Sequence, residues 1–324
     1  MSTYKAATCV EIGKALEIQD RAIPTDIKPN QVHINTHASV VNFADMERCR
    51  GQRDDAPEVP FVPGAVAAGV VLTVGSDVDN VKVGDRVVAL NYGKLGGMAE
   101  QVVVNAKRVF PIPENVSFSK AAGSVVAYSA AIAALEKKAR VQKGDFVLVS
   151  GAAGATGLAI IDAAKSMYGC QVIAVCRGQR KHDFLLERGF DRVIDSTQVN
   201  LVDTVMEMTG GEGVPVAIDV VGGDVLLDSL KCLSTDGTVV IVGFSSGNVP
   251  AIPADVIKQR SLTVMGLNWK TVDSLPIILQ AVSEGKLDPY ICKEFELDQV
   301  NQAYQMVFDK KSLGKVIVCM RKDE

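Results

Sequence analysis

A glycine-rich segment in the middle of the chain has the residue types and spacing of a phosphate-binding turn. Between Gly151 and Gly157 the sequence reads Gly-Ala-Ala-Gly-Ala-Thr-Gly. Glycine at such positions lets the backbone approach a pyrophosphate and lets a helix pack closely against a strand. A tight turn in any α/β protein would also use glycine, so the flanking elements must decide between the two interpretations. The residues that we expect against the pyrophosphate are Ala153, Gly154, Ala155, Thr156 and Gly157.

The elements on either side of this turn are those that a dinucleotide site needs. The apolar run at 146–150 predicts a strand, and the apolar spacing at 155–167 predicts a helix. In that order the turn exposes the N-terminus of the helix, where backbone N–H groups bind phosphate. We therefore predict a dinucleotide-binding site.

Charges after the next predicted strand distinguish between the two nicotinamide dinucleotides. The strand at 172–176 ends at Cys176, where an NAD site usually has a carboxylate for the ribose 2′-hydroxyl. Arg177 and Lys181 follow instead, and these cations are able to pair with a 2′-phosphate. The alternative is a solvated, basic first turn of a helix. We predict NADPH rather than NADH as the cofactor.

Ligands of open α/β sheets bind beyond the carboxyl ends of the strands. The apolar strand predicted at 238–243 ends in such a position, and the strand predicted at 214–221 precedes it in the chain. The residues that we expect on the nicotinamide side of the site are Val221, Gly243, Phe244 and Ser245.

Length and composition predict a soluble protein of two domains. The chain has 324 residues, of which 48% are hydrophobic and 22% charged, and its net charge is −4. This balance gives no electrostatic reason to expect nucleic acid or a membrane surface as a partner. The first residues lack a signal pattern, and no uninterrupted apolar stretch reaches the length of a bilayer span. We expect a cytoplasmic location.

Cysteine and histidine spacing predicts neither a disulfide framework nor a metal site. The seven cysteines are scattered, and none belongs to a Cys-x-x-Cys pair. His33 and His37 are four residues apart in a predicted strand, where such residues share a face but lie far apart. No thiolate or carboxylate accompanies them, so we expect no bound metal.

Strand and helix patterns divide the chain into a β-rich part and an alternating part. Short strands with Gly and Pro punctuation up to about residue 115 indicate a compact barrel-like or sandwich domain. After an Ala-rich helix at 121–135, alternation of strands and helices indicates a parallel sheet wound on both faces. The strands expected there are 146–150, 172–176, 192–194, 214–221 and 238–243, and the helices are 155–167, 179–188, 200–208 and 224–232. The last part is predicted helical at 271–284 and 297–308, with a final strand at 315–319 that belongs to the first domain.

Several short motifs resemble the medium-chain dehydrogenase/reductase superfamily, specifically its zinc-free quinone oxidoreductase branch. They include Val-Asn-Phe-Ala-Asp at 41–45, Val-Gly-Asp-Arg-Val at 83–87 and Gly-Lys-Val at 314–316. The resemblance covers nearly the whole chain. It implies an α/β fold with a doubly wound parallel Rossmann sheet at 119–267 and a β-rich GroES-like catalytic domain at 1–118 with 268–324. Zinc-containing relatives carry ligands near Asn42, at the position of Ala65 and in a lobe of four cysteines, and this chain lacks all three.

The resemblance also implies roles for individual residues. The family's lysine for the 2′-phosphate corresponds to Lys181, and its cofactor-contacting tyrosine is replaced by Ser196. An aromatic residue that forms a wall of the acceptor pocket is replaced by Arg53. Asn268 is expected to close over the nicotinamide, and the residues expected at the acceptor are Asn42, Tyr92 and Tyr128.

These observations leave three functions open. The first is NADPH-dependent, metal-free transfer of hydride to a quinone. The second is reduction of an activated C=C bond in an enal, enone or enoyl thioester, because both reactions need the same hydride geometry. The third is a non-catalytic NADPH-binding sensor. It is suggested by the departures from the family at Arg53 and Ser196 and at Val126, which corresponds to a threonine in the family. The partner is an electrophilic small molecule in the first two cases, and the family implies a homo-oligomer, a dimer or tetramer.

Overall fold

The computed structural model describes residues 2–268 and 272–320, and the chain folds into two compact units. Unit 1 comprises Met1–Val125 and Val272–Glu324, and unit 2 comprises Val126–Thr271. The first boundary lies a few residues beyond the predicted one at 118/119. The reason is that the linking helix begins inside unit 1, where the Phe118 ring packs 4.4 Å from the ring of His37.

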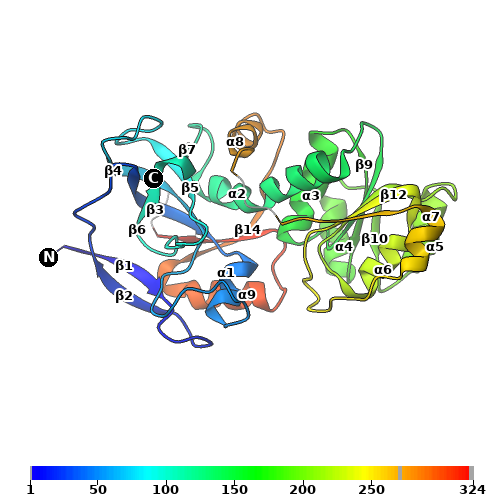
Figure 1. Ribbon diagram of the computed structural model, residues 1–324, viewed down its shortest axis with the longest axis horizontal. Coiled ribbons are helices and arrows are strands. Elements are labelled where there is room, and N and C mark those ends of the chain that lie inside the picture. The colour runs from blue at the N-terminus through cyan, green and yellow to red at the C-terminus, as the bar shows by residue number, and fades with distance from the viewer. Residues whose placement is uncertain (1, 269–271, 321–324) are drawn as a thin grey trace. The chain divides into compact units, whose positions relative to one another are not determined.

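Unit 2 is built on six parallel strands, and five of them are those listed from the alternating pattern. The strands are β8 (Phe146–Ser150), β9 (Gln171–Cys176), β10 (Val193–Asp195), β11 (Val214–Asp219), β12 (Leu233–Ile241) and β13 (Thr263–Gly266). Their spatial order is β10-β9-β8-β11-β12-β13, the order of a dinucleotide-binding sheet. Figure 1 labels β9, β10 and β12 of this sheet among the helices of the same unit. The order reverses between β8 and β11, and this reversal marks the ligand-binding edge of such a sheet.

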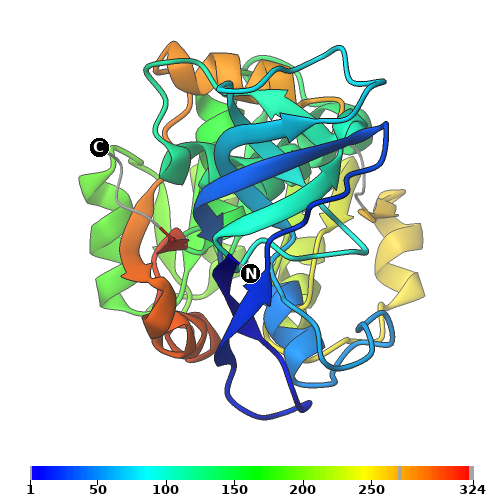
Figure 2. The same ribbon diagram turned by 90° about the vertical axis from the view of Figure 1, so that its left-hand side faces the viewer.

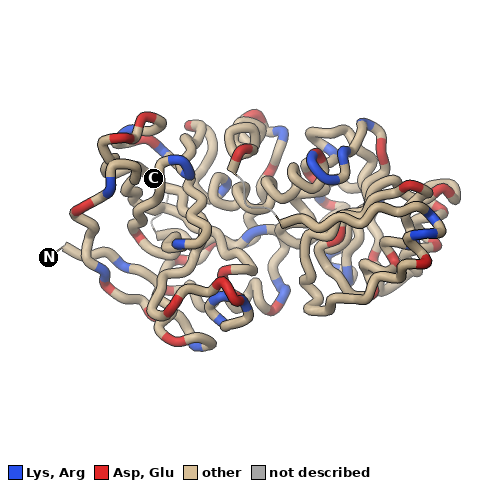
Figure 3. Tube along the Cα trace, viewed as in Figure 1, with Lys and Arg blue, Asp and Glu red and all other residues tan. Residues whose placement is uncertain are grey.

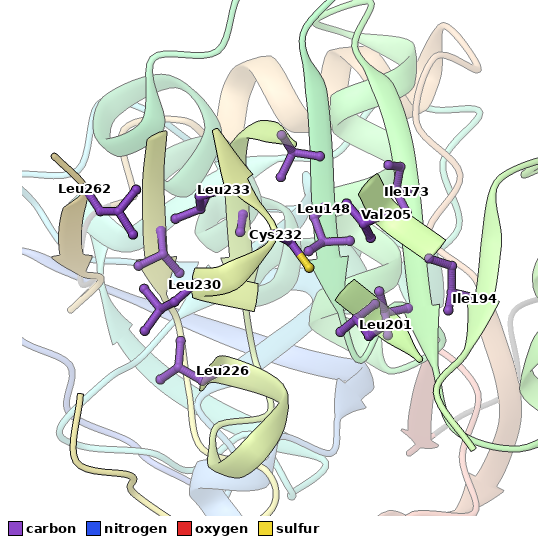
Figure 4. Close-up of a cluster of buried hydrophobic side chains, with 14 residues drawn as sticks. Leu148, Ile173, Ile194, Leu201, Val205, Leu226, Leu230, Cys232, Leu233 and Leu262 are labelled. Atoms are coloured by element: carbon purple, nitrogen blue, oxygen red, sulfur yellow. The ribbon is translucent and has the colours of Figure 1, made fainter. Parts of the chain in front are cut away.

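Helices cover both faces of this sheet. The crossover helices expected from the sequence are α3 (Ala155–Ser166), α4 (Gln179–Glu187), α5 (Leu201–Met208) and α6 (Gly223–Lys231). Leu148 and Ile173 point from the strands into an apolar cluster that also contains Leu201 and Leu230 (Figure 4). The alternate strand residues are buried on the opposite face, and this double burial explains the continuous apolar strands. A further helix, α7 (Ala254–Arg260), was not predicted.

Unit 1 is β-rich, with the final strand in the predicted domain. Its sheet has the order β14-β15-β3-β4-β5-β7, with β6 paired to β3, and β1 and β2 form a separate antiparallel pair (Figure 2). β15 pairs antiparallel with β3 and parallel with β14. The bounds are β1 (Thr3–Thr8), β2 (Glu17–Ala22), β3 (Gln31–Val40), β4 (Val66–Val74), β5 (Arg86–Leu90), β6 (Gln101–Asn105), β7 (Val109–Pro111), β14 (Ile291–Glu296) and β15 (Lys315–Cys319).

The helices of unit 1 are short, and one of them carries candidate site residues. α1 (Phe43–Cys49) follows β3 and was not predicted. α8 (Leu275–Ser283), the 3₁₀ turn η3 (Leu297–Gln299) and α9 (Val300–Phe308) match the helical segments expected near the end of the chain, and a second 3₁₀ turn is η1 (Ala106–Arg108).

The helix that links the two units is the longest helical segment in the described residues. α2 (Phe118–Ile132) continues into a π-helical segment, η2 (Ala133–Ala139). By length and composition the 22 residues could cross a membrane, although charged residues such as Lys120 and Glu136 interrupt the apolar run. However, 83% of the apolar window is buried inside the protein, as in the core helix of a soluble protein.

Candidate functional site

The glycine turn in unit 2 has a shape that only glycine permits at two positions. Gly151 has a φ of 62°, in the left-handed region that favours glycine. A Cβ atom on Gly157 would lie 2.2 Å from the carbonyl oxygen of Gly151, so the first turn of α3 packs directly on the backbone of the loop. Gly154 is the N-cap residue of α3. These contacts set the start of α3 against the end of β8.

Backbone N–H groups at the start of α3 are available to a ligand. In the described part of the chain, no protein acceptor takes the N–H of Ala155, Thr156 or Gly157. The first N–H groups of a helix need an acceptor from outside the helix, and a phosphate supplies both acceptor atoms and negative charge. The turn therefore fits a pyrophosphate.

The residues predicted for the cofactor gather at one edge of the sheet, because each follows the carboxyl end of a parallel strand. The turn after β11 and the loop after β12 are tied together, since the N–H of Ser245 donates to the carbonyl of Val220 at 3.1 Å. Phe244 is exposed, and Asn268 is exposed directly after β13. Residues 269–271, to which the predicted closing segment extends, lie outside the described residues.

The two cations predicted for the 2′-phosphate lie after β9. Arg177 is exposed and Lys181 is half-buried. Sequence reasoning missed a carboxylate in this place: Asp195, from the end of β10, accepts from the N–H of Gly178 at 2.8 Å. Burial opposes its ionisation, but this bond and two from Thr197 outweigh burial and lower the pKa of Asp195. A negative charge therefore faces the loop that carries both cations.

Ser196 contributes to this loop through the backbone of the neighbouring strand. Its hydroxyl donates to the carbonyl of Cys176 at 3.1 Å, and its N–H donates to the same oxygen. The hydroxyl thereby joins the ends of β9 and β10. Its predicted contact with phosphate stays a prediction.

A buried serine and aspartate, neither of which was predicted as a site residue, stand where the strand order reverses. The Ser150 hydroxyl at the end of β8 donates to Asp219 at the end of β11, at 2.5 Å. The second carboxylate oxygen of Asp219 accepts from the N–H of Gly222 at 2.6 Å. Burial raises the pKa of Asp219, and these bonds partly offset the shift. The pair fixes the β11 turn beside the glycine turn.

In unit 1, Asn42 belongs to a buried polar cluster on α1 and β15. Asp45 is fully buried and accepts from the N–H of Ala65 at 3.2 Å and from Arg48 at 3.1 Å. The Asn42 amide nitrogen donates to Asp45 at 3.4 Å, and its oxygen accepts from Lys315 at 3.4 Å. Burial raises the pKa of Asp45, and its bonds to Ala65 and Arg48 act against this shift. The spacing of Asn42 and Asp45 is visible in the sequence, whereas their contact with Lys315 is not.

The cluster continues to the surface through an ion-pair network. Asp55 accepts from Arg48 at 2.9 Å and from Arg53 at 2.8 Å. Arg53 therefore makes this side of the predicted pocket charged where the family has an aromatic ring. The pKa of Tyr92 is raised to about 12 by burial and then by the nearby charge of Asp45, so its hydroxyl stays protonated at neutral pH.

Tyr128 belongs to unit 2, whereas the other acceptor candidates, Asn42 and Tyr92, belong to unit 1. Tyr128 is 2% exposed on α2 within unit 2, and its hydroxyl donates to Asp162 on α3 at 2.6 Å. This bond gives the hydroxyl a structural partner, and its predicted role at the acceptor stays a prediction.

The donor set in the described residues does not fit a zinc ion. Among residues 2–268 and 272–320 no three His, Cys, Asp or Glu side chains form a group that could hold a metal. His33 instead contacts Gln101 at 2.9 Å, and His37 packs on Phe118. We therefore derive no step that involves a metal.

Comparison with known proteins places the chain in a family. Residues 28–114 match the model of the alcohol dehydrogenase GroES-like domain, and residues 155–284 match the model of zinc-binding dehydrogenases. Quinone oxidoreductase-like protein 2 of Rattus norvegicus is 40% identical over 98% of this chain and 93% of the relative. The chain belongs to the quinone oxidoreductases of the medium-chain dehydrogenase/reductase superfamily.

Other family members agree over the whole length. Quinone oxidoreductase of Sus scrofa is 32% identical over 93% of this chain and 92% of the relative. The solved structure of the quinone oxidoreductase from Coxiella burnetii is 29% identical, with a TM-score of 0.85 over 99% of this chain and 100% of the relative. As a member of this family the chain is an oxidoreductase that uses a nicotinamide cofactor, and the predicted Rossmann and GroES-like fold is confirmed.

Proposed function

We propose that this oxidoreductase uses NADPH to reduce quinones without a metal. The cofactor assignment depends on a pair of cations, Arg177 and Lys181, which follow β9. The glycine turn follows β8, the strand next to β9 in the same sheet. An exposed guanidinium and an ammonium suit a 2′-phosphate, which NADH lacks. The names of the relatives support a quinone as acceptor.

The residues of the chain have separate tasks in this proposal. The N–H groups at the start of α3 hold the pyrophosphate, and the loops after β11 and β12 orient the nicotinamide. When bound, the cofactor supplies the hydride. Asn42 and Tyr92 provide hydrogen-bond donors for the acceptor oxygen, on which negative charge develops as hydride arrives. The cytoplasmic location and the homo-oligomer stay predictions, as does the absence of a nucleic-acid partner. Figure 3 shows Lys and Arg interspersed with Asp and Glu in both units.

Reduction of an activated C=C bond is the second candidate. The observation that favours it is the charged side formed by Arg53 and Asp55, because a quinone ring would stack better on an aromatic residue. An enone or enoyl thioester has a polar oxygen but no ring that needs such a wall.

Steady-state kinetics with the purified chain distinguish these functions. NADPH and NADH oxidation is followed by nicotinamide absorbance with benzoquinone, phenanthrenequinone and a medium-chain alkenal. We expect turnover with the quinones and NADPH, and slower turnover with NADH. Turnover of the alkenal alone would favour the second candidate. Binding of NADPH in a fluorescence titration without turnover of any acceptor would instead support a sensor.

A further inference from the structure

Lys315 enters the candidate acceptor site from the far end of the chain. Lys315 is the first residue of β15. The N–H of Val41 donates to the carbonyl of Val316 at 3.0 Å, which places the start of β15 beside the end of β3. Gly314 before it has a φ of 68°, and a Cβ atom there would lie 2.6 Å from the carbonyl oxygen of Tyr290. The backbone at Lys315 is thereby fixed next to Asn42.

The ammonium of Lys315 is buried with too few partners. The residue is 7% exposed, and within the described residues the only bond of its Nζ is the one of 3.4 Å to the oxygen of Asn42. An ammonium has three donors, and buried charges in proteins are ordinarily well paired. Burial lowers the pKa of Lys315 to about 8, and the charge of Asp45 acts against this shift. Burial of a cation with spare donors lowers the stability of the fold. Such a group is therefore a candidate for a functional role.

Asn42 is held from both sides by this cation and by Asp45. Its amide oxygen faces Lys315 and its amide nitrogen faces Asp45, each at 3.4 Å. An amide nitrogen has two hydrogens, so one of them is left for a further acceptor. Asp45 is fixed in turn by Ala65 and Arg48. The amide is therefore held in one orientation before any ligand binds.

We propose that Lys315 is a positioning residue of the acceptor site, which fixes the Asn42 amide toward the acceptor oxygen and places positive charge behind it. This inference rests on the proposed quinone reduction. Hydride from NADPH reduces the quinone to a hydroquinone anion and leaves NADP⁺, and a proton from water then completes the hydroquinone. The anion is the species that the charge behind Asn42 stabilises, because negative charge develops on its oxygen.

Lys315 is the member of the cluster whose charge changes in the accessible pH range. Asp45 on α1 is the charged group that acts on it, and the guanidinium of Arg48 beyond Asp45 stays charged throughout. Burial raises the pKa of Tyr92 to about 12 and that of Tyr304 on α9 well above its usual value. Turnover limited by hydride transfer should therefore fall as pH rises above the pKa of Lys315.

The test compares Lys315→Met and Lys315→Arg with the wild type and with Lys293→Met. Lys293 is an exposed lysine on the neighbouring strand β14, 4.6 Å from the ring of Phe295, and serves as the matched control. For each protein, kcat and KM for benzoquinone are measured from about pH 6 to about pH 10. NADPH affinity and melting temperature are measured in parallel.

We expect Lys315→Met to lower kcat about tenfold near neutral pH and to abolish the alkaline fall, with NADPH affinity unchanged. Lys315→Arg should restore part of kcat and keep it at high pH, because a guanidinium does not titrate there. Wild-type kcat and pH profile in a folded Lys315→Met protein would overturn the proposal, as would an equal loss at every pH with the alkaline fall retained. A wild type that binds NADPH but reduces no quinone would overturn the proposed function, and this inference with it.

Discussion

Replacement of Gly157 by alanine tests whether the glycine turn is built around a close backbone contact. A Cβ atom at this position would lie 2.2 Å from the carbonyl oxygen and 2.7 Å from the carbonyl carbon of Gly151, and 2.8 Å from the Cα of Ala152. All three neighbours are backbone atoms, so no side chain is able to rotate out of the way. The start of α3 or the turn itself must shift.

The cost follows from the size of this overlap. Overpacking by a methyl group commonly costs about 1–3 kcal/mol, and rigid backbone neighbours place Gly157→Ala near the upper end, at about 3 kcal/mol. For a unit of this size, 1 kcal/mol corresponds to roughly 2–4 °C in melting temperature, so we expect a fall of about 6–12 °C. Displacement of the N–H groups of α3 should also lower the affinity for NADPH by about tenfold or more, since a hydrogen bond to a charged group contributes about 1.5–3 kcal/mol.

Gly266 provides the matched control, because a Cβ atom there would meet no atom within 4 Å. Melting curves by circular dichroism and NADPH titration by fluorescence are recorded for Gly157→Ala, Gly266→Ala and the wild type. Gly266→Ala should resemble the wild type in both. If Gly157→Ala melted and bound NADPH like Gly266→Ala, the turn would not depend on this contact and the argument from backbone packing would be wrong.

Charge and hydroxyl substitutions in both units have outcomes of predictable sign. Alanine at both Arg177 and Lys181 should lower the affinity for NADPH about tenfold to a hundredfold in a fluorescence titration and leave the affinity for NADH unchanged. Asp195→Asn should raise the affinity for NADPH about threefold, and unchanged affinity would show that the charge of Asp195 does not act on the 2′-phosphate. Tyr128→Phe should lower the free energy of unfolding in urea by about 1.5–3 kcal/mol with unchanged quinone turnover, whereas a lower kcat would place the hydroxyl at the acceptor. Because the pKa of Lys315 falls from 10.5 to about 8 on folding, the unfolded chain binds more protons between these values. The free energy of unfolding should rise with pH there, by at most about 3 kcal/mol, and Lys315→Met should lack this rise.

The fold of unit 2 could be predicted because its signals are local. Apolar strands buried on both faces alternate with helices, and each predicted crossover helix begins within a residue or two of the observed one. α1 and α7 were missed because seven-residue helices hold too few turns to show a period. The β-rich unit was predicted only as barrel-like or sandwich, since the pairing of β15 with β3 joins distant parts of the chain and leaves no local pattern.

The candidate site also has one part that local sequence could predict and one part that only the fold brings together. The glycine turn is visible in the sequence because its chemistry belongs to consecutive backbone groups. Asp195 was missed because it reaches the loop after β9 from the next strand along the sheet, and a search of the residues after Cys176 does not include it. Likewise, a buried lysine such as Lys315 is unremarkable in sequence until the fold places it beside Asn42, 273 residues away.

Side-chain substitutions in the two units should therefore have different effects on cofactor binding and acceptor reduction. In unit 2 the proposed pyrophosphate contacts come from backbone N–H groups. Side-chain substitutions leave these groups in place unless they disturb the turn, as at Gly157. In unit 1 the candidate acceptor contacts come from side chains, and Asn42 is oriented by the opposite charges of Lys315 and Asp45. Substitutions in this network should alter acceptor reduction while cofactor affinity stays constant. A change of acceptor between quinone and activated alkene is then expected to involve Arg53 and its neighbours, and to leave the glycine turn unchanged.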